Sequence, residues 1–149
     1  MKPKLLLRIT SLLTLFIAIG HIMDHITRKV TTVPAGKEVI RQMESYKFNF
    51  NGSMRSWDNF YEGLSLDVSL VLIIFAVIFS MLSVIAKKHH KMCYNMLWPY
   101  LVVNIGFAIT SFKYFFIVPG ITFVVICLLL IYAMLQLRQH SIAAEHHHV

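Results

Sequence analysis

Two histidines and one aspartate lie within five positions near the start of the chain, in the stretch GHIMDH at residues 20–25. His21 and His25 are four residues apart, so a helix presents both on one face, with Asp24 close to them. An imidazole beside a carboxylate can transfer protons, orient the polar end of a ligand or bind a metal ion. An apolar segment precedes these three residues. The surroundings of their side chains, and therefore their chemistry, depend on where that segment ends.

The composition indicates a membrane protein. Of the 149 residues, 57% are hydrophobic and 14% are charged, whereas soluble domains average about 25% charged residues. A membrane-spanning helix needs about 20 largely apolar residues. Four segments approach or exceed this length: residues 5–26, 64–86, 96–112 and 116–137.

These segments predict an all-α fold: a polytopic membrane four-helix bundle that forms a single domain over residues 1–149. One sizeable outer loop, at residues 27–56, is expected to cap the bundle between helices 1 and 2. We expect the first segment to stay attached as a helix, because no small-residue cleavage site follows it.

The basic residues predict the orientation through the positive-inside rule. With both termini in the cytoplasm, seven Lys and Arg residues lie on each side, which is a tie. Two features favour this arrangement. The basic loop KKHHK at residues 87–91 is compact, and six of the seven acids lie on the other side. We therefore predict a multi-pass protein of a bacterial inner membrane. The net charge of +7 lies at the ends of the spans, so we expect no nucleic-acid partner.

The outer loop contains the pattern of a short amphipathic helix at residues 34–48, PAGKEVIRQMESYKF. Pro34 suits the first helical position, and Val39, Ile40 and Met43 share one face. We expect this helix to lie at the membrane interface.

A turn at residues 49–53, NFNGS, separates this helix from the start of the second span. Ser56 can cap that span, with Asp58 in its first turn, where a negative charge is favoured. Three aromatic residues predict an interfacial belt there: Trp57, Phe60 and Tyr61.

Ionisable residues of three helices are expected to lie at one depth. Asp67 is about one turn inside the apolar region, and an ionisable group there is costly and therefore a functional candidate. We expect it to be buried and paired with a histidine or with Lys113. On the same helix, Asn59, Gly63 and Asp67 form a stripe. The whole layer comprises His21, Asp24, His25, Asp58, Glu62, Asp67 and Lys113.

Three functions, and a purely structural role, are compatible with this layer. In the first, a pocket open to the outer leaflet binds a lipid-like or quinone-like molecule, whose polar head the histidines and carboxylates orient. The candidate ligand-binding residues are His21, His25, Trp57, Tyr61, Glu62, Asp67 and Lys113.

The second function is metal binding, and the third is a proton or ion pathway. The pathway would start at Asp67 and Asn104, but the fourth helix has no charged residue to continue it. The metal pattern lacks the glutamate of metalloprotease helices, and two histidines on one helix face cannot clamp a haem iron from opposite sides. The candidate metal ligands are His21, Asp24, His25 and Glu62.

Gly20-His21 and the segment WDNFYEGLSL at residues 57–66 resemble a family of small, uncharacterised bacterial membrane proteins with four helices. In that family, Gly-His lies late in helix 1, and a W-D-F-Y-x-G motif begins helix 2, often after a pair like Arg55-Ser56. Here Asn59 is an additional residue. The architecture is more distantly similar to DoxX-like proteins. The resemblance implies that His21 and the segment 55–63 form one unit, but it implies no activity.

We therefore expect an integral membrane protein whose polar cluster binds a small amphipathic ligand. The expected partners are membrane lipid and a lipid-like small molecule. The alternative is a structural or accessory subunit with a membrane-protein partner, or a homo-oligomer. The sequence indicates no cofactor, and it leaves open whether any reaction is catalysed, because it contains no nucleophile or cofactor motif.

Overall fold

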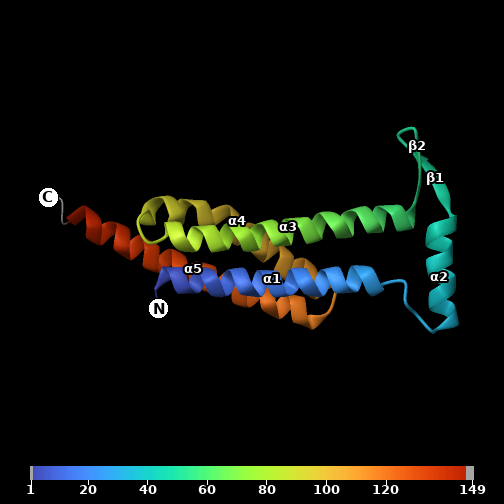
Figure 1. Ribbon diagram of the computed structural model, residues 1–149, viewed down its shortest axis with the longest axis horizontal. Coiled ribbons are helices and arrows are strands. Elements are labelled where there is room, and N and C mark those ends of the chain that lie inside the picture. Colours follow the sequence, from blue (N-terminus) through green and yellow to red (C-terminus); the bar gives the residue numbers. More distant parts are fainter. Residues whose placement is uncertain (1, 147–149) are drawn as a thin grey trace. The chain divides into compact units, whose positions relative to one another are not determined.

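The computed structural model describes the backbone of residues 2–146 and the side chains of residues 2–141. It confirms the predicted all-α fold (Figure 1), with one short hairpin in addition. The elements are α1 (Pro3–Thr27), α2 (Pro34–Ser45), β1 (Lys47–Phe50), β2 (Ser53–Ser56), α3 (Trp57–Ile85), α4 (His90–Tyr114) and α5 (Ile117–His146).

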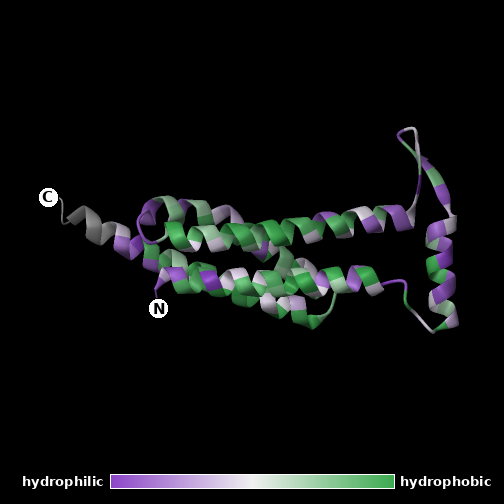
Figure 2. Ribbon diagram, viewed as in Figure 1, coloured by the Kyte–Doolittle hydropathy of each residue, from purple (hydrophilic) through white to green (hydrophobic). Residues whose placement is uncertain are grey.

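Four of the helices are long and apolar enough to cross a membrane, as the sequence predicts: Pro3–Thr27, Trp57–Ile85, His90–Tyr114 and Ile117–Ser141. Figure 2 shows apolar residues along most of their length and hydrophilic residues concentrated in α2 and near the helix ends. The third helix is longer than its apolar segment, because polar residues at both ends continue it and Pro99 is accommodated within it. Membrane helices tolerate such prolines where neighbouring groups satisfy the freed carbonyl.

The chain divides into two compact units, which are described separately. Unit 1 comprises Met1–Ile17 and Ile73–Val149, and unit 2 comprises Ala18–Leu72. Both α1 and α3 continue from one unit into the other. The single domain expected from the sequence stays a prediction.

The core of unit 1 is built on the packing of α4 against α5. Phe107 and Phe123 meet with ring centroids 5.1 Å apart. A Cβ at Gly120 would lie 2.7 Å from the ring of Phe112, so only glycine permits this close approach near the α4–α5 connection. On α3, the ring of Phe79 is fully buried and packs edge-on to Tyr100 of α4.

In unit 2, α2 runs transverse to the portions of α1 and α3 that belong to the same unit (Figure 1). It begins at Pro34, as predicted, but it ends at Ser45, so the predicted extension to residue 48 is wrong. The chain instead becomes extended at Tyr46 and enters the hairpin. Packing of the Phe48 ring on Trp57, with centroids 5.0 Å apart, holds this extended segment against α3.

The predicted turn at residues 49–53 is the tip of this hairpin. Asn51 and Gly52 both have positive φ, at 49° and 82°, which is the requirement of the tight turn that Asn-Gly favours. The Asn49 side chain accepts a hydrogen bond of 2.8 Å from the Gly52 N–H and fixes the turn.

Ser56 caps α3 as expected. Its hydroxyl oxygen accepts the Asn59 N–H at 3.3 Å, while the Asn59 side-chain oxygen accepts the Ser56 N–H at 3.1 Å. The pair satisfies two backbone donors that the first turn of the helix leaves without intrahelical partners. Asn59, the additional residue in the motif, is thus the second half of a capping box.

We expect Ser56→Ala to lower the free energy of unfolding by about 1 kcal/mol, because the Asn59 N–H in the first turn of α3 loses its side-chain acceptor. Hydrogen exchange at the Asn59 amide should accelerate in parallel. Ser53→Ala, in the exposed part of the same strand, is the control. Equal effects of the two substitutions would show that the cap does not stabilise α3.

Candidate functional site

Unit 2 contains six of the seven ionisable residues that the sequence places in one layer. Lys113 is in unit 1, where its Nζ lies 5.0 Å from the centre of the Tyr114 ring. The six residues are His21, Asp24 and His25 on α1, and Asp58, Glu62 and Asp67 on α3.

Both histidines contact Ser65 of α3. Nε2 of His21 lies 3.2 Å from the Ser65 carbonyl oxygen, and Nδ1 of His25 lies 3.0 Å from the Ser65 hydroxyl. The Ser65 hydroxyl lies 3.3 Å from the same Nε2. When Nε2 carries a hydrogen, it donates to the carbonyl oxygen, which only accepts. The two side chains therefore attach α1 to α3 through one buried serine.

This His–Ser arrangement lacks the other parts of a nucleophilic site. Ser65 is buried, whereas a nucleophile must be reachable by substrate. Asp24, the carboxylate nearest in sequence, is exposed, and in the described part of the chain it accepts no hydrogen bond that would orient either imidazole. The contacts with Ser65 are therefore positional.

Asp58 is the centre of an ion-pair network. Its carboxylate accepts hydrogen bonds from Arg28 at 2.6 Å and from Lys29 at 2.8 Å. Lys29 also contacts Glu44 of α2 at 2.6 Å, and the Arg28 guanidinium lies 4.9 Å from the centre of the Tyr61 ring. The network joins the segment after α1 to α2 and to the first turn of α3.

The electrostatics of this network favour the charged forms of both cations. The hydrogen bond to Asp58 raises the pKa of Arg28 above its ordinary value. Hydrogen bonds to Asp58 and then to Glu44 raise the pKa of Lys29. Arg28 and Asp58 are only 12% and 7% exposed in their side chains, so neither charge is well hydrated and each depends on the other.

The remaining acids are arranged differently from the expectation. Asp67 is exposed, so its predicted burial is wrong, and among the described residues it has no hydrogen bond or ion pair. Glu62 is exposed as well. No group of three or more His, Cys, Asp or Glu side chains within the described residues could hold a metal ion. The proposed metal ligands are thus not assembled as a site here.

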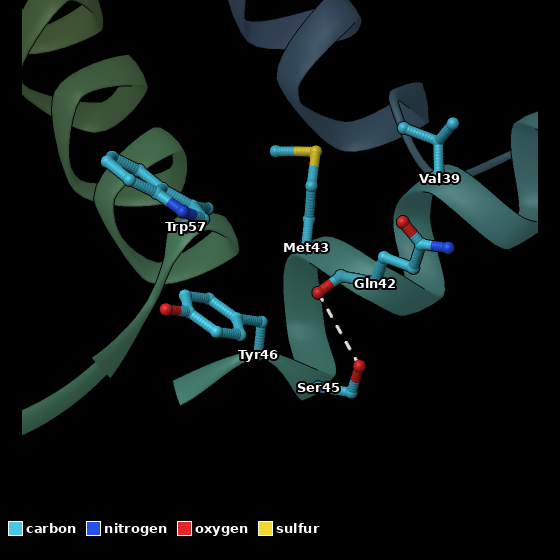
Figure 3. Close-up of a pocket in the computed structure, with 6 residues that line it drawn as sticks. All are labelled: Val39, Gln42, Met43, Ser45, Tyr46 and Trp57. Carbon is cyan, nitrogen blue, oxygen red and sulfur yellow. Dashed lines mark hydrogen bonds between the residues drawn. The ribbon is translucent and has the colours of Figure 1, made fainter. Parts of the chain in front are cut away.

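Two open grooves lie beside this network in unit 2. The first, which we call the Trp57 groove, has a volume of about 660 Å³. Figure 3 shows the Met43 side chain between Val39 and the aromatic rings of Trp57 and Tyr46. The groove is lined by Val39, Gln42, Met43, Ser45, Tyr46 and Trp57.

The second groove, which we call the Asp67 groove, has a volume of about 450 Å³. Its lining includes the predicted stripe of Asn59, Gly63 and Asp67 on α3, together with residues of the hairpin such as Arg55. Apart from its chain neighbours and the nearby backbone of α3, no described heavy atom lies within 4 Å of the position that a Cβ would take at Gly63, so the stripe is open at its middle.

Sequence analysis missed the partners that complete these arrangements. Arg28 and Lys29 contributed only to the charge count, and no contact was predicted for Ser65. Tyr46 and Phe48 were assigned to a helix, although aromatic residues before an Asn-Gly turn favour a strand. That turn is the signal from which the hairpin could have been predicted.

The fold and the site together define a multi-pass integral membrane protein in which polar residues at the ends of two long helices are mutually paired. Comparisons of the chain with models of protein families, with curated proteins and with solved structures find no significant match.

We expect Asp58→Asn to destabilise unit 2 by about 3 kcal/mol, because it leaves the poorly hydrated Arg28 without a counter-charge. Hydrogen exchange in α2 and in the first turn of α3 measures the loss. Asp24→Asn is the control, since its exposed carboxylate has no hydrogen bond among the described residues; its effect should stay within about 0.5 kcal/mol. If hydrogen exchange is equally fast in the Asp58→Asn and Asp24→Asn proteins, Asp58 does not hold the segment after α1 against α3.

We expect nitrogen NMR to find a hydrogen on Nε2 of His21, because this atom faces the Ser65 carbonyl oxygen, which only accepts. Ser65→Ala removes the hydroxyl that both histidines contact but keeps that carbonyl. The substitution should therefore change the Nδ1 shift of His25 and leave the His21 tautomer unchanged. A neutral His21 with its hydrogen on Nδ1 would contradict the contact.

Proposed function

We propose that this protein binds a small amphipathic molecule, of lipid or quinone type, in the Trp57 groove. The observation that carries the proposal is the composition of the groove: four apolar or aromatic side chains, together with the amide of Gln42 and the hydroxyl of Ser45. Ligand sites are commonly apolar concavities with a few polar groups that fix orientation. Because none of the described side chains that line it is charged, the groove suits an apolar body with an uncharged hydrogen-bonding head.

The depth of the groove supports access from the membrane. Residues 64–85 of α3 extend about 33 Å at 1.5 Å per residue, close to the roughly 30 Å thickness of bilayer hydrocarbon. Trp57 precedes this stretch by seven positions, or about 10 Å, which corresponds to the headgroup level. Trp and Tyr are enriched at that level because their rings are apolar and their N–H and O–H groups are polar. Trp57 is 56% exposed, so its ring is available to a ligand.

The proposal also includes the orientation of the chain in the membrane. With four spans, both termini lie on the same side of the membrane. The compact basic loop at residues 87–91 supports the cytoplasmic side of a bacterial inner membrane for the termini, and the Trp57 groove then belongs to the outer leaflet.

The resemblance to a family of small four-helix membrane proteins is part of the same proposal. Its two motif regions lie in one unit, where His21 hydrogen-bonds to Ser65, two residues after Gly63. This contact supports the expectation that Gly20-His21 and the segment 55–63 act together.

A second candidate function is an accessory subunit that packs against a larger membrane protein or against a second copy. The observation that favours it is the pairing within the polar layer: His21 and His25 with Ser65, and Arg28 with Asp58. Members of the layer that are paired in this way need no ligand to satisfy them. This function predicts no saturable binding in the Trp57 groove.

We expect a brominated monoolein to quench the fluorescence of Trp57 saturably in a Trp98→Phe background, where Trp57 is the sole tryptophan. Val39→Ala should weaken this binding about fivefold, since removing two methyl groups from a partly covered wall costs about 1 kcal/mol. Brominated oleate, which is charged, should bind more weakly than the uncharged monoolein.

Two controls separate groove binding from partition into the micelle. Val33→Ala changes an equally exposed valine, at 59% against 57% for Val39, that does not line the groove. The Trp57→Phe protein reports on Trp98 alone and should show only linear quenching. Linear quenching of Trp57 as well, or equal effects of the two valine substitutions, would refute binding in the groove.

A further inference from the structure

The formal charge of the chain is divided unequally between the two units. Unit 2 contains six Lys and Arg residues and six Asp and Glu residues, so its formal net charge is zero. Unit 1 contains eight Lys and Arg residues and one acid, Glu145. Unit 1 therefore carries the entire formal net charge of +7.

Contacts within unit 1 bring most of these cations to one end of its helices. Lys4, near the start of α1, lies beside Arg8 and beside Lys87 of the α3–α4 loop. The His90 ring, at the start of α4, stacks on His140 of α5, with centroids 5.2 Å apart. The stretch of α5 that carries Arg138 therefore reaches the same end as that loop.

Among the side chains that the structure describes, residues 2–141, unit 1 contains no Asp or Glu. Like charges in contact repel each other by an amount that grows as the local dielectric falls. Near a membrane surface the dielectric is lower than in bulk water, so an anion placed between such lysines is stabilised by both. Within the described residues, Nδ1 of His90 is buried without a hydrogen-bond partner, so this end also contains an unsatisfied polar group.

We propose that the basic end of unit 1, defined as Lys4, Arg8, Lys87, Lys88 and Arg138, binds the phosphate of an anionic phospholipid such as phosphatidylglycerol. Lys4 and Lys87 are its direct contacts, because they come from different elements and meet side by side. The residues lie near the ends of membrane-spanning helices or in the loop between two of them, where phospholipid phosphate is the abundant anion. This site is separate from the Trp57 groove, which lies in unit 2 and has no charged lining.

Native mass spectrometry of the full chain tests this site, in detergent that contains equal amounts of phosphatidylglycerol and phosphatidylcholine. We expect the protein to retain phosphatidylglycerol preferentially. The Lys4→Gln, Lys87→Gln variant should bind it about 30-fold more weakly, since each lysine near a membrane phosphate contributes roughly fivefold. Retention of phosphatidylcholine should not change.

Two further variants control for charge and for folding. Lys37→Gln, Lys47→Gln removes two positive charges from unit 2 and should leave phosphatidylglycerol retention unchanged. Lys4→Arg, Lys87→Arg keeps the charges and should keep most of the binding. Equal retention of the two lipids by the unmodified chain, or equal losses in the two glutamine variants, would overturn the proposal. Complete displacement of the lipid by inorganic phosphate would overturn its assignment to a lipid.

Discussion

The carboxylate of Asp58 is the group on which the geometry of unit 2 depends. An unpaired charge that is almost inaccessible to water costs several kcal/mol, so the chain must bring counter-charges to it. Arg28 and Lys29 do so from the residues that follow α1, while Asp58 lies in the first turn of α3. Each charge is also at the helix end whose macrodipole favours it. Lys29 reaches Glu44 as well, so one network fixes two long helices and the short α2.

This use of the polar residues determines where a ligand can bind. His21 and His25 direct ring nitrogens to Ser65, and Arg28 directs its guanidinium to Asp58 and Tyr61. A ligand that displaced these contacts would have to replace their hydrogen bonds in a poorly hydrated place, which is costly. The grooves beside the network carry no such cost. In the Trp57 groove, Met43 of α2 lies between Val39 and Trp57, and the network connects α2 to α3 beside it through Lys29.

The sequence predicts the features of this molecule that depend on local physics. Length and hydropathy suffice for the four spans because hydrocarbon requires a helix that satisfies its own backbone. The start of α2 at Pro34 and the cap at Ser56 follow from the conformations of single residues. Asp67 shows the limit: its place within an apolar stretch predicted burial, but burial depends on which helix packs against that face. That packing is a tertiary property.

The sequence could not predict which cations pair with Asp58, for the same reason. Three acids at the start of α3 and several cations in the loop offered many combinations, and only the path of the loop selects Arg28 and Lys29. His25 and Ser65 are separated by 40 residues, so neither propensity nor periodicity relates them.

Because their charges differ, the two units respond differently to the salt concentration. Salt screens interactions of exposed charges over about 8 Å at physiological ionic strength. Attraction of an anionic headgroup to the basic end of unit 1 must therefore weaken as salt rises. The Trp57 groove has no charged lining, and burial of an apolar body in it depends on the area removed from water. A ligand held in unit 2 and a lipid held in unit 1 can thus be distinguished by ionic strength alone, because only the second depends on unscreened charge.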